Sequence, residues 1–203
     1  MKKIMFNDKF HLTQVVLNGR KTMTRRIVTE KLLDRWTDYD DFCNSVSVEN
    51  TPTTRQYYDE KEFFLDNASY KVGEIIAIAQ SYKDCGNIPD YELDEDGYPI
   101  MPKKSGFFNK MFVKADLMPH HIEITDIKVE RLQDISDEDC MKEGIEEHLK
   151  GIQYGFPSNI GYIGQYPFSN PREAFSALID KVSGKGTWEC NPFVWAYEFK
   201  LID

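Results

Sequence analysis

The chain has 203 residues, a formal net charge of −9 at pH 7 and a pI near 5.0. This acidic balance excludes a protein that coats nucleic acid with a broadly basic surface. No apolar run approaches the roughly 18 residues that a membrane span requires, and Asp8 and Lys9 interrupt the N-terminal apolar residues. The widely spaced cysteines form no Cys-x-x-Cys pair. We therefore expect a cytoplasmic protein with free thiols, no signal peptide, no metal site and no other cofactor.

The first half of the chain predicts one short helix and two strands. Residues 8–17 carry an apolar stripe that Asn7 can cap and that Asn18-Gly19 ends, which predicts a helix. Residues 20–28 favour a strand because they contain two Thr residues followed by Ile-Val. Residues 75–79 are a short apolar run that is typical of a buried strand.

Three further segments of the second half show strand patterns. Residues 107–113 predict a strand or a strand-like edge. Residues 121–132 predict a long strand whose apolar positions change faces, which indicates a bulge near Thr125-Asp126. Residues 193–201 alternate strictly between the two faces, which is the clearest strand signal in the chain.

Two helices are also predicted in the second half. Ser136 begins the first with a pattern that resembles a capping box, and Gly144 interrupts it after two turns. Asn170 and Pro171 open the second, and Gly184 ends it. Mixed helices and mostly antiparallel strands indicate an α+β fold. We expect a small β-barrel with flanking helices.

The remaining segments are long and irregular. We expect a single domain over residues 1–203 that is enlarged by insertions near 29–69, 84–106 and 150–169. A strand-to-helix turn rich in glycine does not occur, so a doubly wound nucleotide fold has little support.

Residues 20–26 place four basic side chains within seven positions of an acidic chain. They form either an anion or nucleobase pocket, in which Arg offers a planar fork, or a solvated turn and edge strand. Lys21 lies in the turn and Thr24 on the strand, so their side chains can meet in one pocket. A Lys buried among Arg charges can act as a base, and a Thr hydroxyl can act as a nucleophile.

Four segments of the chain, in order, resemble the ASCH domain family. The segment 19–26 resembles the family signature, and 70–75 resembles the turn before its second core strand. The segment 124–145 resembles ASCH proteins encoded by phages and prophages, as does the end of the chain over 184–195. Together they cover about half of the sequence.

The resemblance implies a β-barrel related to the PUA fold and a cleft beside 19–26 that binds RNA or a modified nucleoside. Some small family members are similar to amidohydrolases that remove the acyl group from 4-N-acetylcytidine. Their catalytic positions match Lys21, Thr24 and Glu143 of this chain. Lys21 would then activate Thr24 or a water, and Glu143 would pass a proton to the leaving amine. Arg20 or Arg26 would hold the base or the developing oxyanion.

Glu143 also has a structural alternative, because it is one of several acids between 134 and 147 that can simply solvate a helix face. Outside the signature, Trp188 is a candidate for stacking on a base, and Lys185 for contacting phosphate. The positions expected to bind a ligand are Gly19, Arg20, Arg25, Arg26, Lys185 and Trp188.

The leading hypothesis is a site for single-stranded RNA or a modified nucleoside. The second is an amidohydrolase that acts on an acylated cytidine, and the third is a phage-associated protein-interaction module with unknown protein partners. Acidic residues concentrate in 38–41, 84–96 and 134–147. This distribution excludes a broad duplex groove but permits one small site beside 20–26 for a base or strand end.

Overall fold

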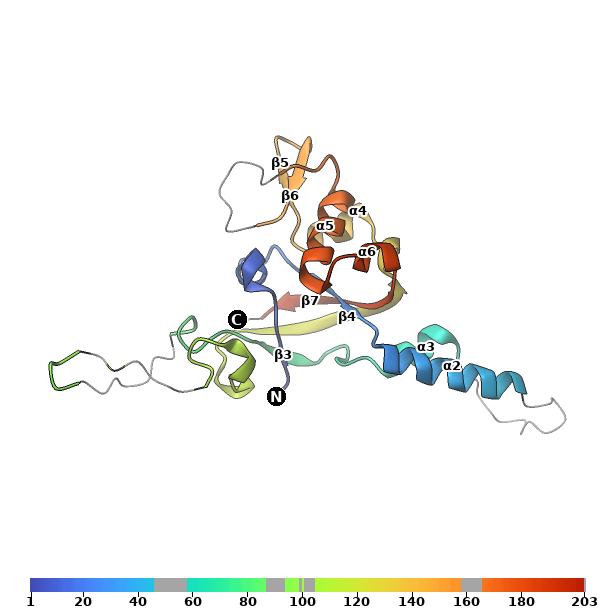
Figure 1. Cartoon of the computed structure of the whole chain (residues 1–203), viewed down its shortest axis with the longest axis horizontal. Helices are drawn as coiled ribbons and strands as arrows, with labels where there is room; N and C mark the ends of the chain where they lie inside the picture. Colours follow the sequence, from blue (N-terminus) through green and yellow to red (C-terminus); the bar gives the residue numbers. More distant parts are fainter. Residues whose placement is uncertain (46–57, 87–93, 99, 101–104, 158–165, 203) are drawn as a thin grey trace.

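The computed structural model describes residues 1–45, 58–86, 94–98, 100, 105–157 and 166–202. Its centre is a five-stranded sheet with a lobe of helices on one side and an arm at each end (Figure 1). In spatial order the strands are β1 (Lys3–Ile4), β3 (Ile75–Ile78), β4 (His121–Arg131), β7 (Phe193–Leu201) and β2 (Met23–Ile27).

The two longest strands, β4 and β7, pair antiparallel along the middle of the sheet. Their register shifts between Ile124 and Asp126, so the bulge expected from the change of faces is confirmed. The β1–β3 pair is parallel and the other pairs are antiparallel. Within the described residues β1 and β2 are the two edges, and the sheet does not close. An α+β fold is therefore present, and the expected barrel is not confirmed.

The helical lobe contains α4 (Asp137–Lys142), α5 (Pro171–Ser183) and α6 (Thr187–Cys190) (Figure 1). Ser136 caps α4 by accepting a hydrogen bond from the Asp139 N–H, as its sequence pattern predicts. Asn170 caps α5 in the same way by accepting from the Glu173 N–H. Both helices thus begin where short polar side chains satisfy free backbone donors.

Two of the predicted elements differ from the structure. The segment 8–17 is divided into a 3-10 turn, η1 (Asp8–Phe10), and α1 (Leu12–Leu17), because His11 adopts a left-handed conformation with φ 51°. The strand predicted over 107–113 is instead a 3-10 turn, η3 (Lys110–Phe112). The side chain of Asn109 accepts from the backbone of this turn, which satisfies it locally and removes the need for a sheet partner.

The insertions contain secondary structure of their own. The first holds α2 (Glu30–Ser45) and α3 (Glu60–Asp66), which form one of the two arms. At the third, a small sheet pairs β5 (Glu146–His148), which precedes the insertion, with β6 (Gln153–Gly155), which lies in the segment 150–169 predicted as a loop. The short turns η4 (Ala115–Leu117) and η5 (Leu132–Asp134) flank β4. The described residues 94–98 lie on the other arm, and much of 84–106 lies outside the described residues.

The main core lies between the sheet and the helices. Tyr197 of β7 and Phe64 of α3 are fully buried, and Phe175 of α5 is 1% exposed. The indole N–H of Trp195 donates to the backbone oxygen of Phe64 at 2.8 Å, so α3 is tied to the centre of the sheet. The predicted alternation of 193–201 therefore places aromatic rings in the core.

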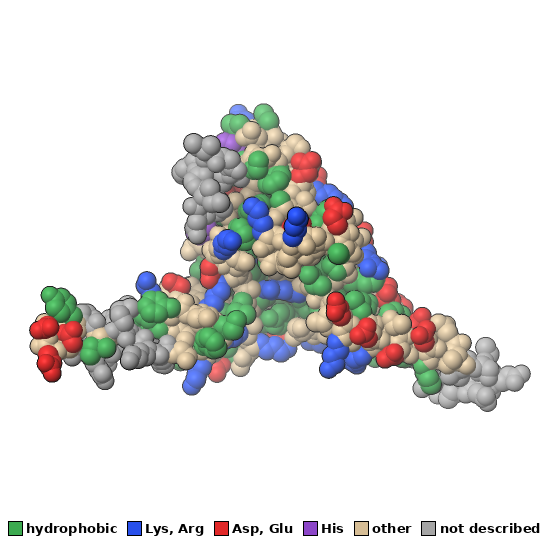
Figure 2. Space-filling model, in the orientation of Figure 1, with side chains coloured by type: hydrophobic (Ala, Val, Ile, Leu, Met, Phe, Trp, Pro, Cys, Tyr) green, Lys and Arg blue, Asp and Glu red, His purple; other side chains and the backbone are tan. Residues whose placement is uncertain are grey.

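Charge is distributed unevenly over the surface. Lys and Arg side chains lie at the junction of lobe and sheet, whereas Asp and Glu side chains are frequent on both arms (Figure 2). None of the described helices has the length and apolar character needed to cross a bilayer.

Candidate functional site

The turn between α1 and β2 brings the basic segment to the junction of lobe and sheet. Gly19 has φ +71°, a left-handed conformation that favours glycine, and its N–H donates to the Val16 oxygen at 2.8 Å. The N–H groups of Arg20 and Lys21 both donate to the Val15 oxygen at 3.1 Å. This tight reversal directs Lys21 back toward the lobe.

The end of α4 supplies the opposite side of the site. The Thr22 N–H donates to the Lys142 oxygen at 2.9 Å, which joins the start of β2 to the end of α4. Glu143 is the C-cap of α4, and Gly144 follows with φ +99°. A Cβ atom on Gly144 would lie 3.6 Å from the Cβ of Lys21. The absence of a side chain there lets α4 approach the basic turn closely.

Lys21 and Glu143 form a buried ion pair. The Lys21 Nζ lies 2.5 Å from Glu143 Oε2 and 2.7 Å from the Glu143 backbone oxygen. Only 2% of the Lys21 side chain and 6% of the Glu143 side chain are exposed. Burial lowers the pKa of Lys21, and the Glu143 carboxylate opposes this effect without cancelling it. Lys21 thus releases a proton more readily than an ordinary lysine.

Arg25 holds the same carboxylate from the other side. Its Nη1 lies 3.2 Å from Glu143 Oε1, and its Nη2 lies 2.6 Å from Glu130 Oε1 and 3.2 Å from Asp139 Oδ2. Burial disfavours the charged guanidinium, but Glu143 and Glu130 outweigh it and raise the pKa of Arg25. Protein carboxylates occupy most of its donors, so Arg25 fixes Glu143 in place.

Lys21, Glu143 and Thr24 share a cavity of about 200 Å³. The Thr24 hydroxyl forms no hydrogen bond with another described residue. One wall is apolar and comes largely from α5. The lining residues on that wall are Phe175, Leu178, Ile179 and Val182. The cavity therefore combines a charged, hydroxyl-bearing end with a surface that suits an apolar or aromatic group.

Arg26 also lines this cavity, and Arg20 does not. The Arg26 Nη2 donates to the Met5 oxygen at 2.6 Å, and its guanidinium lies 5.9 Å from the Phe6 ring centre. Arg20 turns outward and pairs with Glu146 in a wide depression beside β5. The resemblance implied that either Arg20 or Arg26 would hold the base or the oxyanion. In the structure only Arg26 of these two lines the cavity.

Three other candidate positions lie outside the lining of this cavity. Gly19 shapes the turn, as described above. Lys185 is exposed between α5 and α6. Trp188 lies on α6 instead of in a loop, and it packs against the core with its ring 6.2 Å from that of Phe175. Its surroundings are those of a core residue more than of a stacking platform.

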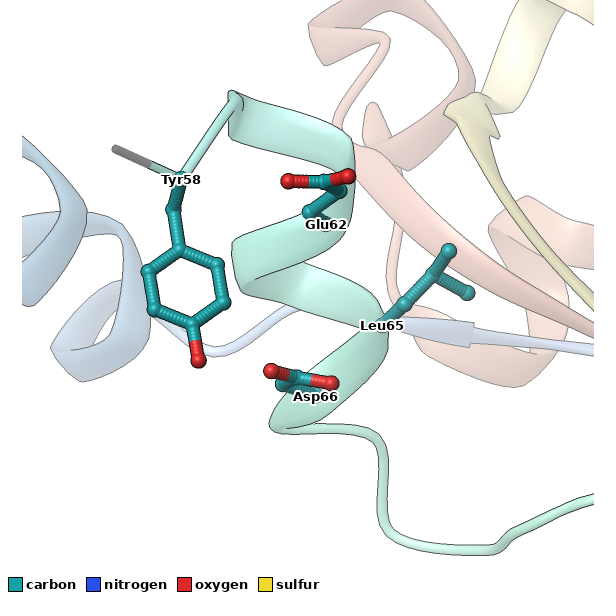
Figure 3. Close-up of a pocket in the computed structure, with 4 residues that line it drawn as sticks. All are labelled: Tyr58, Glu62, Leu65 and Asp66. Atoms are coloured by element: carbon teal, nitrogen blue, oxygen red, sulfur yellow. The ribbon is translucent and has the colours of Figure 1, made fainter. Parts of the chain in front are cut away.

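A different cavity, of about 400 Å³, lies against α3. Figure 3 shows its lining, with the Tyr58 hydroxyl beside Asp66 and with Glu62 and Leu65 on the same helix. A hydrogen bond to the Asp66 carboxylate raises the pKa of Tyr58. With two acids and no basic residue in its lining, this cavity disfavours phosphate or another anion.

Several residues that build the site were not identified from the sequence. Glu130 of β4 and Asp139 of α4 hold Arg25, although the sequence indicated no role in the site for either residue. Asp139 lies four residues before Glu143, so both side chains face one side of the helix. This spacing is the sequence signal from which the role of Asp139 beside Glu143 could have been predicted. Within the described parts of the chain, no group of three or more His, Cys, Asp or Glu residues could hold a metal ion.

No family model and no curated protein matches this sequence. A solved structure, protein EF3133 from Enterococcus faecalis V583 with the family model DUF984, aligns with 100% of this chain and 81% of its own chain. The sequence identity is 12% and the TM-score is 0.37. At this level of similarity neither residues nor function can be carried over from that protein.

Proposed function

We propose that this chain is an ASCH-type protein with a PUA-like, barrel-derived fold, and that the cavity beside 19–26 binds one base of single-stranded RNA or a modified nucleoside. The observation that carries the proposal is the buried pair of Lys21 and Glu143, which opens with Thr24 onto a cavity with an apolar wall. The four resembling segments add independent support from the sequence.

The size and charge of the cavity favour a single base. Its volume of about 200 Å³ is below the roughly 300–1,000 Å³ that is typical of sites for drug-sized ligands. A base would place its flat face on the apolar wall from α5, where Val182 is the most exposed residue, and its polar edge toward Lys21 and Thr24. Arg26, at the same cavity, would contact the sugar or a phosphate.

An amidohydrolase is the second candidate, and the lowered pKa of Lys21 favours it. The Glu143 carboxylate would first take a proton from the Lys21 ammonium within the pair. The Thr24 oxygen would attack the acyl carbon of an N-acylated base while the neutral Lys21 amine takes the hydroxyl proton. The C–N bond would then break, and the protonated Glu143 would give its proton to the leaving amine. A water would hydrolyse the resulting ester, which releases a carboxylic acid and restores the Thr24 hydroxyl.

Binding is tested with fluorescent single-stranded RNA and with free nucleosides at several salt concentrations. We expect Arg26→Ala to weaken RNA binding and to reduce the magnitude of the salt slope by about one. Lys128→Ala is the matched control because Lys128 is exposed on β4 and does not line the cavity. An absence of binding at low salt, for RNA and nucleosides alike, contradicts the binding proposal.

Catalysis is tested by following the absorbance of 4-N-acetylcytidine. Turnover that is lost in Thr24→Val, while RNA binding falls less than it does in Arg26→Ala, would support the amidohydrolase. A lack of turnover by the wild type, while a small ASCH amidohydrolase is active in the same assay, excludes this substrate. The binding proposal does not depend on that result.

A further inference from the structure

The N-terminal segment forms one wall of the cavity beside 19–26 without belonging to the sheet there. Phe6 and Asn7 are among the lining residues. The strand β1 ends at Ile4, whose backbone oxygen accepts from the Ala79 N–H at 2.9 Å. The segment that follows has no strand partner among the described residues. Contacts other than sheet pairing therefore set the position of this wall.

Two cationic side chains hold consecutive backbone oxygens of the segment. Arg26 of β2 donates to the Met5 oxygen, and Lys110 of η3 donates to the Phe6 oxygen. Lys110 comes from the turns between β3 and β4, which lie beside the N-terminal segment in Figure 1. The wall is thus held from two elements that are distant from it in the sequence, and one of them follows the insertion at 84–106.

Lys110 places its ammonium group among three acceptors. Besides the Phe6 oxygen, its Nζ lies 3.1 Å from Thr13 Oγ1 and 2.7 Å from Asp8 Oδ1. The Thr13 hydroxyl donates to the same Asp8 oxygen at 2.5 Å. An ammonium group has three N–H donors and no acceptor, so these contacts use its full capacity. Only 16% of the Lys110 side chain is exposed, which keeps competing water away from most of it.

Asn7 lies between the two residues that Lys110 holds, Phe6 and Asp8. Its own side-chain oxygen accepts from the Lys9 N–H at 3.0 Å, and its backbone oxygen accepts from the Leu12 N–H at 3.0 Å. The amide nitrogen of Asn7 has no hydrogen bond with a described residue. A residue that lines the cavity therefore has a fixed backbone and two N–H donors without a protein partner.

We propose that Lys110 is a positioning residue for the cavity beside 19–26, because it holds Phe6 and Asn7 at the wall. Lys110 itself does not line the cavity. The inference rests on the proposed function for the kind of ligand that binds. Without the Lys110 ammonium, the Phe6 oxygen and the Asp8 carboxylate lose their shared donor and the wall loosens. A ligand must then order the wall when it binds, which lowers its affinity.

The test compares the affinity of free cytidine for the wild type, Lys110→Met and Lys3→Met. Cytidine is uncharged at neutral pH, so the loss of a distant positive charge does not by itself weaken its binding. We expect Lys110→Met to reduce the affinity by about fivefold. Lys3→Met is the matched control, since Lys3 donates to the Met111 and Val113 oxygens at 2.7 Å but does not line the cavity. It should loosen the same turn and leave the affinity unchanged.

A double-mutant cycle with Asn7→Ala tests whether Lys110 acts through the wall. We expect Lys110→Met to cost less affinity in the Asn7→Ala background, because the side chain that it positions is already absent. A change that only lowered overall stability would produce no such coupling. Fully additive losses would overturn the positioning role.

Amide hydrogen exchange at Leu12 gives a readout that needs no ligand, because this N–H donates to the Asn7 oxygen. We expect its exchange to be about fivefold faster in Lys110→Met and unchanged in Lys3→Met. If the wild type binds neither cytidine nor RNA, the proposed function fails, and the Leu12 exchange still decides the role of Lys110.

Three results would overturn the proposal: unchanged Leu12 exchange in Lys110→Met, unchanged cytidine affinity in that variant, or equal affinity losses in Lys110→Met and Lys3→Met. If Lys110→Met does not fold, Lys110→Gln decides by the same criteria. It keeps a polar side chain at this partly exposed position but is too short to reach the same three acceptors.

Discussion

The Nζ of Lys21 lies 2.5 Å from Oε2 of Glu143, although 122 positions separate the two residues. The contact joins the start of β2 to the end of α4 and buries two opposite charges at the wall of a cavity. A buried charge is tolerated only when it is paired and hydrogen-bonded, so this pair has consequences for stability as well as for chemistry.

Removal of one partner should destabilise the fold. We expect Lys21→Met to lower the free energy of unfolding by about 3 kcal/mol, because Glu143 then keeps only Arg25 as a buried cation. Urea denaturation measures the loss. Lys2→Met is the control, since Lys2 forms an exposed pair with Glu74 and should change stability by less than about 1 kcal/mol. Similar losses in the two variants would contradict the prediction.

Arg25 cannot be replaced by lysine without a loss. Its guanidinium contacts three carboxylates at once, a geometry that a single ammonium group cannot reproduce. We expect Arg25→Lys to destabilise the protein by about 2 kcal/mol in thermal or urea unfolding. Arg26→Lys, at a neighbouring and more exposed position, should cost less than about 1 kcal/mol. Equal costs would mean that the carboxylate cluster contributes little.

Gly144 should tolerate alanine worse than Gly19 does. Both have positive φ, at +99° and +71°, so both substitutions carry a conformational cost of about 1 kcal/mol. A new Cβ at Gly144 would also lie 3.3 Å from Val15 Cγ1, whereas none of the surrounding atoms lies within 4 Å at Gly19. We therefore expect the larger fall in melting temperature for Gly144→Ala. The reverse order would argue against close packing of α4 on the turn.

The thiol of Cys140 makes stability depend on pH in the alkaline range. Burial raises its pKa from 9.0 to about 12, so above pH 9 the unfolded chain loses this proton while the folded chain keeps it. The contribution of Cys140 is present below pH 9 and is lost as the pH rises toward 12. Between pH 9 and pH 12 this thiol makes the free energy of unfolding fall by about 1.4 kcal/mol per pH unit.

Unfolding of Cys140→Ala between pH 8 and pH 10.5 tests this prediction. The variant should lose stability less steeply than the wild type above pH 9, and parallel curves would contradict it. In the native protein at pH 8, a thiol reagent should modify the exposed Cys190 and leave Cys140 intact.

The sequence identified elements whose signals are local. Ser136 and Asn170 predicted the starts of their helices, because a cap depends on the residue and its next few neighbours. The strand over 193–201 and the bulge near Asp126 were also predicted, because both depend on the local pattern of apolar positions, and both are confirmed. The strand predicted over 107–113 was wrong, since its apolar and polar residues also suit a 3-10 turn that Asn109 caps.

For the site, the sequence by itself determined that four basic residues follow the first helix, and the family resemblance named Glu143 as the acid that would act with Lys21. Only the tertiary structure decided that Glu143 contacts Lys21, that Arg25 is held by protein carboxylates, and that Arg20 turns away from Arg26. Those outcomes depend on sheet register and on the approach of α4 at Gly144, which side-chain spacing along the chain does not encode.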